Sequence, residues 1–310
     1  MNILHFAFTD KFQEELKYIL NLYDIELKYH QFEDNTFGKY NIGEERAINY
    51  WNKFKNIFNT FDLIIITDTS PLLRVLVNNF KKPIIVWMNN RIDYYDSATN
   101  DCKFPDDNYY KLLKADNIIF LSMSNFDKFY CNKIKKLYLD ITLCRPIGVQ
   151  ETYLKATNNE LYTFYLSQTH NELKVLNLNN ILDDNKINYI NTYKQNLRGI
   201  IHLPFEWCSY DMYQKLKNND IMFIPSKDFI IDIYENDNYH WQAPFDITNL
   251  EISEWYSDDF KDCFVYFNSW KDLKIKTLTT NYKKKKELIK NVVEKLEKDS
   301  LKVWYNFLST

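Results

Sequence analysis

Short apolar runs alternate with helical patterns along the first half of the chain. Residues 3–8, 61–67 and 83–88 form apolar runs of the length expected for strands buried on both faces. Between such runs the apolar positions recur every three or four residues, as at Phe12 and Leu16, which indicates helices. This alternation is typical of βαβ units, so the pattern predicts an α/β fold with a doubly wound parallel sheet. The expected strands span residues 3–8, 25–29, 61–67, 83–88, 118–122 and 137–143, and the expected helices lie near 12–23, 44–59, 109–114 and 124–136, with another that starts at Ser70 as N-cap and Pro71.

A second series of the same kind follows a break in the pattern. Arg145 to Gly148 and the polar residues 150–160 read as a linker. The expected strands after it span 161–166, 175–178, 199–203 and 221–224, and the expected helices span 185–196 and 209–217. A final helical pattern begins at Tyr282, and Asp299 with Ser300 is expected to start a separate last helix that turns back onto the first domain.

We therefore expect two Rossmann-like domains and a C-terminal helical segment. The predicted boundaries are 1–146, 147–281 and 282–310. Open parallel sheets bind ligands beyond the carboxyl ends of their strands. Two such sheets that face each other would enclose a central cleft, and this cleft is the expected ligand site.

Composition narrows the classes of partner. With 310 residues, 45% of them hydrophobic and 17% aromatic, the chain has enough apolar surface for two cores. A formal net charge of -3 argues against a nucleic-acid partner, which favours a basic protein. The lysines at 283–286 are interpreted as a solvated helix face, although they also form a local basic patch.

Cysteine, histidine and glycine counts exclude several common sites. The five cysteines lie far apart, so neither a disulfide framework nor a Cys-x-x-Cys metal clamp is expected, and a reducing compartment fits best. The five histidines show no metal-ligand spacing, so no metal and no cofactor are expected. Four glycines in the whole chain leave no dinucleotide fingerprint and no Walker loop. Phosphates would therefore be bound by helix N-termini and side chains.

No stretch of the sequence reads as a signal peptide or as a membrane span. The N-terminus lacks a basic region and a long apolar run, and no segment approaches about 18 uninterrupted apolar residues. A cytoplasmic location with peripheral membrane contact at most is the expectation.

Three stretches resemble a known family. Residues 61–93, FDLIIITDTSPLLRVLVNNFKKPIIVWMNNRID, resemble the first domain of two-domain GT-B glycosyltransferases, including members from large DNA viruses and algae. Residues 199–227, GIIHLPFEWCSYDMYQKLKNNDIMFIPSK, resemble their donor-binding half. Trp255-Tyr256 and the run 267–273 also resemble that half. The resemblance covers about a third of the chain and implies a GT-B fold, transfer of a sugar from a nucleotide-sugar donor, and, if the chain is viral, a location in the host cytoplasm.

The donor-binding candidates follow the predicted strands of the second domain. Ser226 and Lys227 follow a strand, where a hydroxyl and a compact cation suit a departing diphosphate, and the resemblance makes them the preferred phosphate contacts. Ser209 and Tyr210 begin a helix whose free N–H groups suit a diphosphate, although an ordinary capped helix reads the same way. His170 and His202 are candidates for contact with the nucleotide, or are simply core histidines.

Catalytic and acceptor-binding candidates follow two strands of the first domain. Asp93 is a candidate general base, or else the partner of Arg91 in a buried ion pair that fixes the loop. Asp68 is a second candidate base, or else a helix cap. Asn90, Arg91 and Ser70 are the expected acceptor contacts.

These observations predict a metal-independent glycosyltransferase that takes a nucleotide-sugar donor and a glycan or other hydroxyl acceptor. Two other functions stay open at this point. One is a non-catalytic nucleotide-sugar-binding or scaffold protein, and the other is an epimerase that acts on nucleotide-linked sugars.

Overall fold

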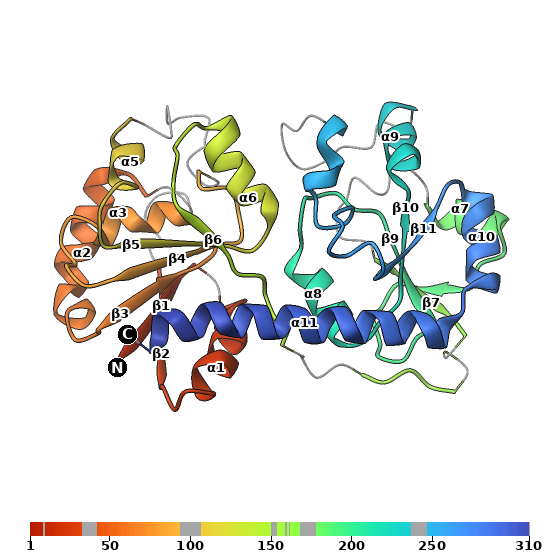
Figure 1. Ribbon diagram of the computed structural model, residues 1–310, viewed down its shortest axis with the longest axis horizontal. Helices are drawn as coiled ribbons and strands as arrows, with labels where there is room; N and C mark the ends of the chain where they lie inside the picture. Colours follow the sequence, from red (N-terminus) through yellow and green to blue (C-terminus); the bar gives the residue numbers. More distant parts are fainter. Residues whose placement is uncertain are drawn as a thin grey trace. The chain divides into compact units, whose positions relative to one another are not determined.

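The chain folds into two compact units. The structure is a computed structural model and describes residues 1–8, 10–32, 42–93, 107–149, 154–158, 160, 162–167, 178–236 and 247–309. Unit 1 comprises Met1–Pro146 together with Asp299–Thr310, and unit 2 comprises Ile147–Lys298. Each unit is built around its own parallel sheet (Figure 1).

The sheet of unit 1 has six strands, and every neighbouring pair is parallel. Its order is β2-β1-β3-β4-β5-β6. The direction of winding reverses between β1 and β3, so the predicted doubly wound sheet is confirmed. The strands are β1 (Ile3–Ala7), β2 (Leu27–Gln31), β3 (Leu63–Ile66), β4 (Ile84–Met88), β5 (Ile118–Ser122) and β6 (Ile141–Leu143).

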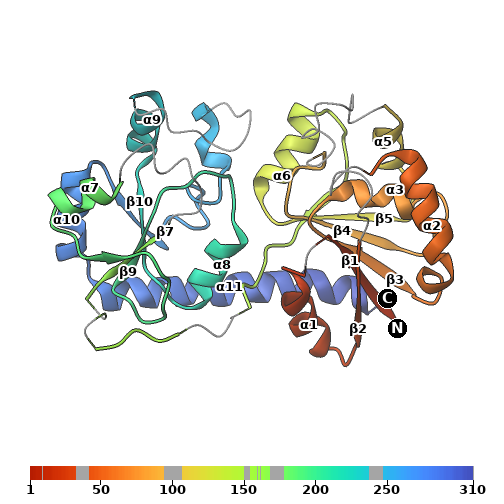
Figure 2. The same ribbon diagram turned by 180° about the vertical axis from the view of Figure 1, so that it is seen from behind.

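Helices cover both faces of this sheet. One face carries α1 and the last part of α11, and the other carries α2, α3, α5 and α6 (Figures 1 and 2). Trp87 of β4 lies in the core of the first face, with ring centroids 5.6 Å from Phe12 and 5.4 Å from Trp304 of α11. The helices are α1 (Gln13–Asn21), α2 (Glu44–Phe58), the 3-10 turn η1 (Ser70–Leu72), α3 (Leu73–Leu76), α5 (Asp107–Leu112), α6 (Asn125–Phe129), the π-helical turn η2 (Tyr130–Ile134) and α11 (Tyr282–Leu308).

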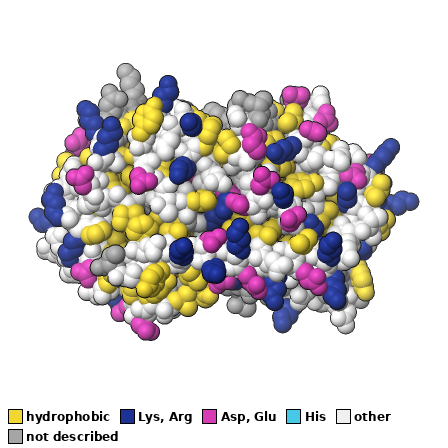
Figure 3. Space-filling model, viewed as in Figure 1, with side chains coloured by type: hydrophobic (Ala, Val, Ile, Leu, Met, Phe, Trp, Pro, Cys, Tyr) yellow, Lys and Arg dark blue, Asp and Glu magenta, His cyan; other side chains and the backbone are white. Residues whose placement is uncertain are grey.

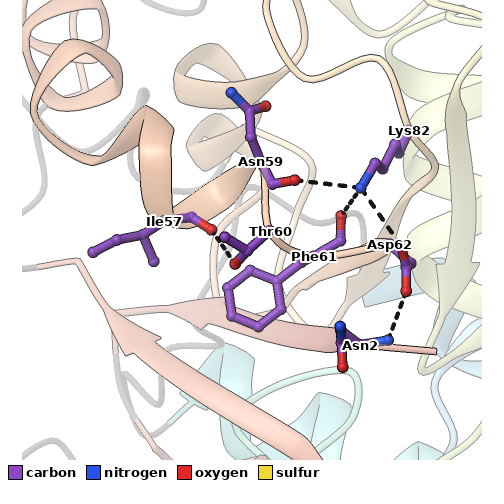
Figure 4. Close-up of polar contacts among 7 residues, drawn as sticks. All are labelled: Asn2, Ile57, Asn59, Thr60, Phe61, Asp62 and Lys82. Atoms are coloured by element: carbon purple, nitrogen blue, oxygen red, sulfur yellow. Dashed lines mark hydrogen bonds and ion pairs between the residues drawn. The ribbon is translucent and has the colours of Figure 1, made fainter.

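A cluster of polar contacts lies at the amino-terminal ends of three strands of this sheet (Figure 4). Lys82 donates to the carbonyl oxygens of Phe61 at 2.6 Å and Asn59 at 3.3 Å. Its Nζ also lies 3.5 Å from Asp62, whose other oxygen accepts the backbone N–H of Asn2 at 2.8 Å. These contacts tie the starts of β1, β3 and β4 together.

The sheet of unit 2 has five parallel strands in the order β11-β10-β9-β7-β8. Its winding reverses between β7 and β9. The strands are β7 (Phe164–Ser167), β8 (Tyr189–Ile190), β9 (Gly199–His202), β10 (Met222–Pro225) and β11 (Phe264–Phe267). The helices are α7 (Leu178–Asp184), α8 (Tyr210–Lys217), α9 (Lys227–Asn236), the 3-10 segment η4 (Ile247–Ile252) and α10 (Trp270–Thr279), with α11 shared between the units.

Two elements expected in the second series are wrong. The helix expected at 185–196 is absent, and residues 189–190 form the short strand β8 instead. Leu178, expected at the end of a strand, is the first residue of α7, and residues 175–177 lie outside the described part. A two-residue strand is too short to show the alternation of a strand. The sequence around it therefore predicts a helix instead.

The last helix does not break where the sequence predicts. α11 runs through Asp299 and Ser300 without interruption, and it belongs to unit 2 up to Lys298 and to unit 1 from Asp299 onward. Buried Ser300 donates its hydroxyl to the carbonyl of Arg145 at 2.6 Å. That bond satisfies the polar side chain inside a helix, so Ser300 does not need to act as a cap.

Gly148 allows the chain to pass directly over α8. Its φ is +75°, and a Cβ built there would lie 2.4 Å from the carbonyl carbon and oxygen of Tyr213. No larger residue fits at this distance, and the positive φ disfavours L side chains as well.

Candidate active site

The carboxyl ends of β1 and β3 meet at the switch point of the first sheet. The chain continues from β1 and from β3 toward opposite sides of the sheet. The loops that follow these two strands therefore diverge, and ligands bind at such a point in parallel sheets. The segment Thr67 to Ser70 follows β3 directly, and all four residues are buried.

Asp68 has a constrained backbone at this point. Its φ is +66°, which is uncommon for a residue other than glycine. Its N–H donates to Oδ1 of Asn89, and its carbonyl accepts from Nδ2 of Asn90, both at 2.8 Å. The structure thus brings two predicted site residues, Asp68 and Asn90, together from adjacent strands. Such constrained residues are concentrated at functional sites.

The helix cap predicted near this loop is displaced by one residue. Thr69 is the N-cap of η1 and makes no capping bond with its side chain, while Ser70 is the first residue of the turn. The expectation that Ser70 is the N-cap is therefore wrong. Pro71 is therefore the second residue of the turn and not the first.

His5 supports the end of β3 and was not predicted as part of the site. Its ring nitrogens lie 2.8 Å from Oγ1 of Thr67 and 2.7 Å from Oε1 of Gln13. Burial lowers the pKa of His5 to about 4, so the ring is neutral at pH 7. The sequence offered no signal for this role, because His5 stands alone within an apolar run.

Asp93 is fully buried and bound on both carboxylate oxygens. Tyr130 donates its hydroxyl at 3.1 and 3.0 Å, and Nζ of Lys135 lies 2.8 Å away. Burial first, and then the Asp93 charge, raise the pKa of Tyr130, which keeps its hydroxyl protonated as a donor. Arg91, the partner considered from the sequence, has its guanidinium 5.7 Å from the centre of the Tyr130 ring. The geometry favours Asp93 as an anchor of the loop after β4, with Lys135 as its cation.

The carboxyl ends of β7 and β9 form the corresponding switch point of unit 2. Ser167 and His202 are the last residues of these strands and are direct partners in the parallel register. His202 is only 3% exposed, and its ring stacks on Trp255 with centroids 4.6 Å apart. Within the described residues neither of its ring nitrogens has a hydrogen-bond partner. Burial lowers the pKa of His202 to about 3, so it is a neutral donor and acceptor at pH 7.

Trp255 belongs to a segment that ties the loops of this edge together. Its Nε1 donates to the carbonyl of Glu206 at 2.9 Å, and Ser253 donates its hydroxyl to the carbonyl of Trp207 at 3.0 Å. Tyr256 donates its hydroxyl to the carbonyl of Pro225, at the end of β10, at 3.1 Å. Trp255 was not predicted as a site residue, although the Trp255-Tyr256 pair was part of the resemblance.

The remaining donor-binding candidates lie at the starts of α8 and α9. Ser209 is the N-cap of α8 and makes no capping bond with its side chain, and Tyr210, the first helical residue, is buried. Ser226 caps α9, since its Oγ accepts the N–H of Phe229 at 3.4 Å. Lys227 is exposed in the first turn of α9. His170 lies outside the described residues.

The described residues include neither a metal-ligand cluster nor a membrane-spanning helix. Within the described ranges no group of three or more His, Cys, Asp or Glu side chains is arranged to hold a metal ion. No helix in the same ranges is both long and apolar enough to cross a membrane.

The two sheets, with their orders and switch points, define the class of protein. The chain has the two-domain α/β fold of GT-B glycosyltransferases. A crystal structure of the glycotransferase of kitacinnamycin matches over 99% of this chain and 98% of its own, with a TM-score of 0.55 and 6% identity. The glycosyltransferase SnogD from Streptomyces nogalater matches over 100% of this chain and 99% of its own, with a TM-score of 0.54 and 8% identity. A glycosyltransferase from Rickettsia africae ESF-5 matches over 99% of this chain and 98% of its own, with a TM-score of 0.53 and 10% identity. The sequence matches no protein-family model and no curated protein.

Proposed function

We propose that this protein transfers a sugar from a nucleotide-sugar donor to a glycan or other hydroxyl acceptor without a metal ion. One observation carries the proposal in a chain of this fold. His202, at the switch point of unit 2, is buried, neutral and without a hydrogen-bond partner among the described residues. A buried polar group without a partner costs about 1–3 kcal/mol, and a ligand that supplies the partner removes this cost.

The donor binds to unit 2 in this proposal. His202 contacts the nucleotide, and the N-terminus of α9 with Ser226 and Lys227 receives the diphosphate. Support comes from the exposed Lys227, whose positive charge adds to that of the helix end. Positive charge fixed there stabilises the diphosphate as it leaves, which is the chemistry that a metal performs in other transferases. The N-terminus of α8, with Ser209 and Tyr210, is the second donor contact.

The acceptor binds to unit 1 in this proposal, beside the carboxyl ends of β3 and β4. Asp68 is the preferred general base, because it lies at the switch point of the sheet with a constrained backbone, whereas Asp93 is fully buried as the anchor of its loop. Asn90, Arg91 and Ser70 orient the acceptor hydroxyl. Orientation of two bound substrates supplies much of the rate enhancement in a transfer reaction.

A nucleotide-sugar-binding protein without activity is the alternative that the fold also supports. A transferase and a binding protein would share the donor site, but only the transferase would release nucleoside diphosphate in the presence of an acceptor. A cytoplasmic location, and a viral origin suggested by the sequence resemblance, also belong to this proposal.

Nucleotide binding and turnover test the proposal in sequence. We expect UDP, GDP, ADP or one of their sugars to raise the melting temperature, because a ligand that binds only the folded chain stabilises it. Release of free nucleoside diphosphate with an acceptor present then separates an enzyme from a binding protein. If no nucleotide or nucleotide sugar raises the melting temperature, the proposal is wrong.

Two variants test the donor site. His202→Phe keeps a ring that can stack on Trp255 but removes the unpartnered ring nitrogens. We therefore expect the nucleotide-induced shift to shrink while the melting temperature of the free protein is kept or rises. Lys227→Ala should weaken binding of the diphosphate, whereas Lys298→Ala, an exposed lysine on α11, should leave it unchanged. Wild-type nucleotide affinity in both His202→Phe and Lys227→Ala would remove these two residues from the site.

A further inference from the structure

A cavity lies in unit 2, along the edge strand β11 of its sheet. Its volume is about 440 Å³, which is within the range of small-molecule sites. The first three residues of the edge strand β11 form its apolar wall, and the end of α10 and the start of α11 form the rest. The cavity therefore lies beside the amino-terminal part of β11, whereas the proposed donor site is at the carboxyl ends of the strands.

Three lysines line this cavity. They are Lys276 of α10 and Lys284 and Lys285 of α11. None of the described lining residues is acidic. Figure 3 shows several basic side chains over the region where α10 and the beginning of α11 lie in Figure 1.

The three lysines differ in how they are used. Lys285 donates to the carbonyl oxygens of Asp262 and Phe264, both at 3.0 Å, and so covers the free edge of β11. Burial lowers the pKa of Lys285, and the nearby Asp262 carboxylate opposes this shift in part. Lys276 and Lys284 have no acidic partner among the described residues. Two cations beside the cavity are therefore available to a ligand.

The start of α11 adds to the positive field. Asn281 accepts the N–H of Lys284 at 3.0 Å, and Lys283 to Lys286 occupy the first turn and a half of this 27-residue helix. Lysines at a helix N-terminus oppose the macrodipole, because both are positive. A multivalent anion in the cavity would relieve this repulsion. The hydroxyls of Thr279 and Thr280, which also line the cavity, already donate to the carbonyls of Ile275 and Lys276 at 3.0 and 2.7 Å, so the lysines are the donors that an anion would use.

We propose that this cavity binds a phosphate monoester that carries an organic group. Lys276 and Lys284 bind the phosphate, since an ammonium group is a compact charge suited to it. Phe264, Val265 and Leu288 contact the organic group. The same chemistry is present in a soluble sugar bisphosphate and in the headgroup of phosphatidic acid.

Isothermal titration calorimetry at low ionic strength tests the proposal. Fructose 1,6-bisphosphate is the soluble probe, and flotation with phosphatidylcholine vesicles that contain phosphatidic acid is the lipid arm. We expect one or both to bind the wild type, and the double variant Lys276→Gln, Lys284→Gln to bind at least about tenfold more weakly. Binding should also weaken as salt is added.

Matched variants make the result specific. Lys295→Gln, Lys298→Gln removes the same charge from exposed positions further along α11 and should keep the wild-type affinity. Lys227→Ala should keep it too, which separates this cavity from the proposed donor site. Lys284→Glu is a further variant at an exposed position that should abolish binding without loss of the fold. Absence of binding to both probes, or an unchanged affinity in the Lys276/Lys284 variant, overturns the proposal.

Discussion

Asp220 is a buried acid, and burying its charged carboxylate at neutral pH costs stability. Burial raises its pKa to about 6, although Tyr193, which donates its hydroxyl to it at 2.5 Å, and Lys215 oppose the shift. The folded chain therefore binds a proton at Asp220 more tightly than the unfolded chain does, so this residue stabilises the fold at low pH and not at neutral pH.

Asp220→Asn should therefore stabilise unit 2 at pH 7.5, by up to about 3 kcal/mol for a shift of two pKa units. The amide keeps an acceptor for the Tyr193 hydroxyl and has no charge to bury. Chemical unfolding at pH 7.5 and pH 4.5 measures the effect, and the advantage should shrink at pH 4.5, where Asp220 of the folded wild type is protonated. A variant that is less stable than the wild type at pH 7.5 would contradict the assigned role of burial.

Asp93→Asn tests whether Asp93 anchors its loop. We expect the free energy of unfolding to fall by about 2 kcal/mol, because the half-buried Lys135 loses its counter-charge. Urea unfolding measures this, and Lys135→Gln in the Asp93→Asn background should cost less than it does alone. Lost turnover with unchanged stability would instead make Asp93 the general base.

At the residue scale the sequence predicted where polar residues would be, and not what they would contact. The end of an apolar run predicted that Asp68 and His202 follow or close buried strands, as they do. It did not predict that Asn90 binds the backbone of Asp68, or that Trp255 stacks on His202. Those partners are distant in sequence, and only the order of the strands brings them together.

Among the elements, the last turns of α11 carry a specific packing role in unit 1. Trp304 is fully buried and packs edge-on against Trp87 of β4. Tyr23 donates its hydroxyl to the carbonyl of Leu301 at 3.3 Å. The C-terminal residues therefore belong to the core of the first sheet.

Trp304→Ala should reduce the stability of unit 1 by about 3–5 kcal/mol, since it leaves a large cavity beside Trp87. Lys302→Ala, an exposed position two residues earlier on the same helix, is the control and should change stability by less than about 0.5 kcal/mol. Thermal unfolding of both variants gives the comparison. Similar melting temperatures for Trp304→Ala and the wild type would mean that α11 is dispensable for unit 1.

The elements themselves were predictable where their patterns are long. Strands β4 and β5 and helices α2 and α8 lie within a residue or two of their expected bounds. The short strand β8 was missed, and the break expected in α11 is absent because Ser300 bonds to Arg145. Tertiary contacts thus decided the elements whose local signal was short or ambiguous.

For the whole molecule, one buried neutral histidine in each unit links stability to pH. The pKa of His5 in unit 1 is lowered to about 4 and that of His202 in unit 2 to about 3. Above the unfolded pKa of 6.5 each ring is neutral in both the folded and the unfolded chain. Stability is lost as the pH falls from 6.5 toward the folded pKa, because only the unfolded chain then binds the proton. Asp220 offsets part of the loss in unit 2, because its raised pKa gives the opposite sign.

We therefore expect acidification from pH 7 to pH 5 to destabilise unit 1 by about 2 kcal/mol and unit 2 by about 1 kcal/mol. Urea unfolding at both pH values, followed by hydrogen-exchange pulse labelling at one fixed pH, resolves the two units by mass spectrometry. His5→Asn should reduce the pH dependence of unit 1 alone. Equal losses in the two units would contradict the opposing role of Asp220.

Hydrophobic periodicity along the chain was enough to predict two parallel α/β sheets, because each strand or helix expresses this local pattern over a few residues. The order of the strands in each sheet is known only from the folded chain. That order selects which loops become neighbours, and so it decided that Asp93 pairs with Lys135, that His202 stacks on Trp255, and that three lysines surround a cavity at the edge of β11. Contacts between residues far apart in the chain leave no periodic trace in the sequence, which is why they became visible only in the folded protein.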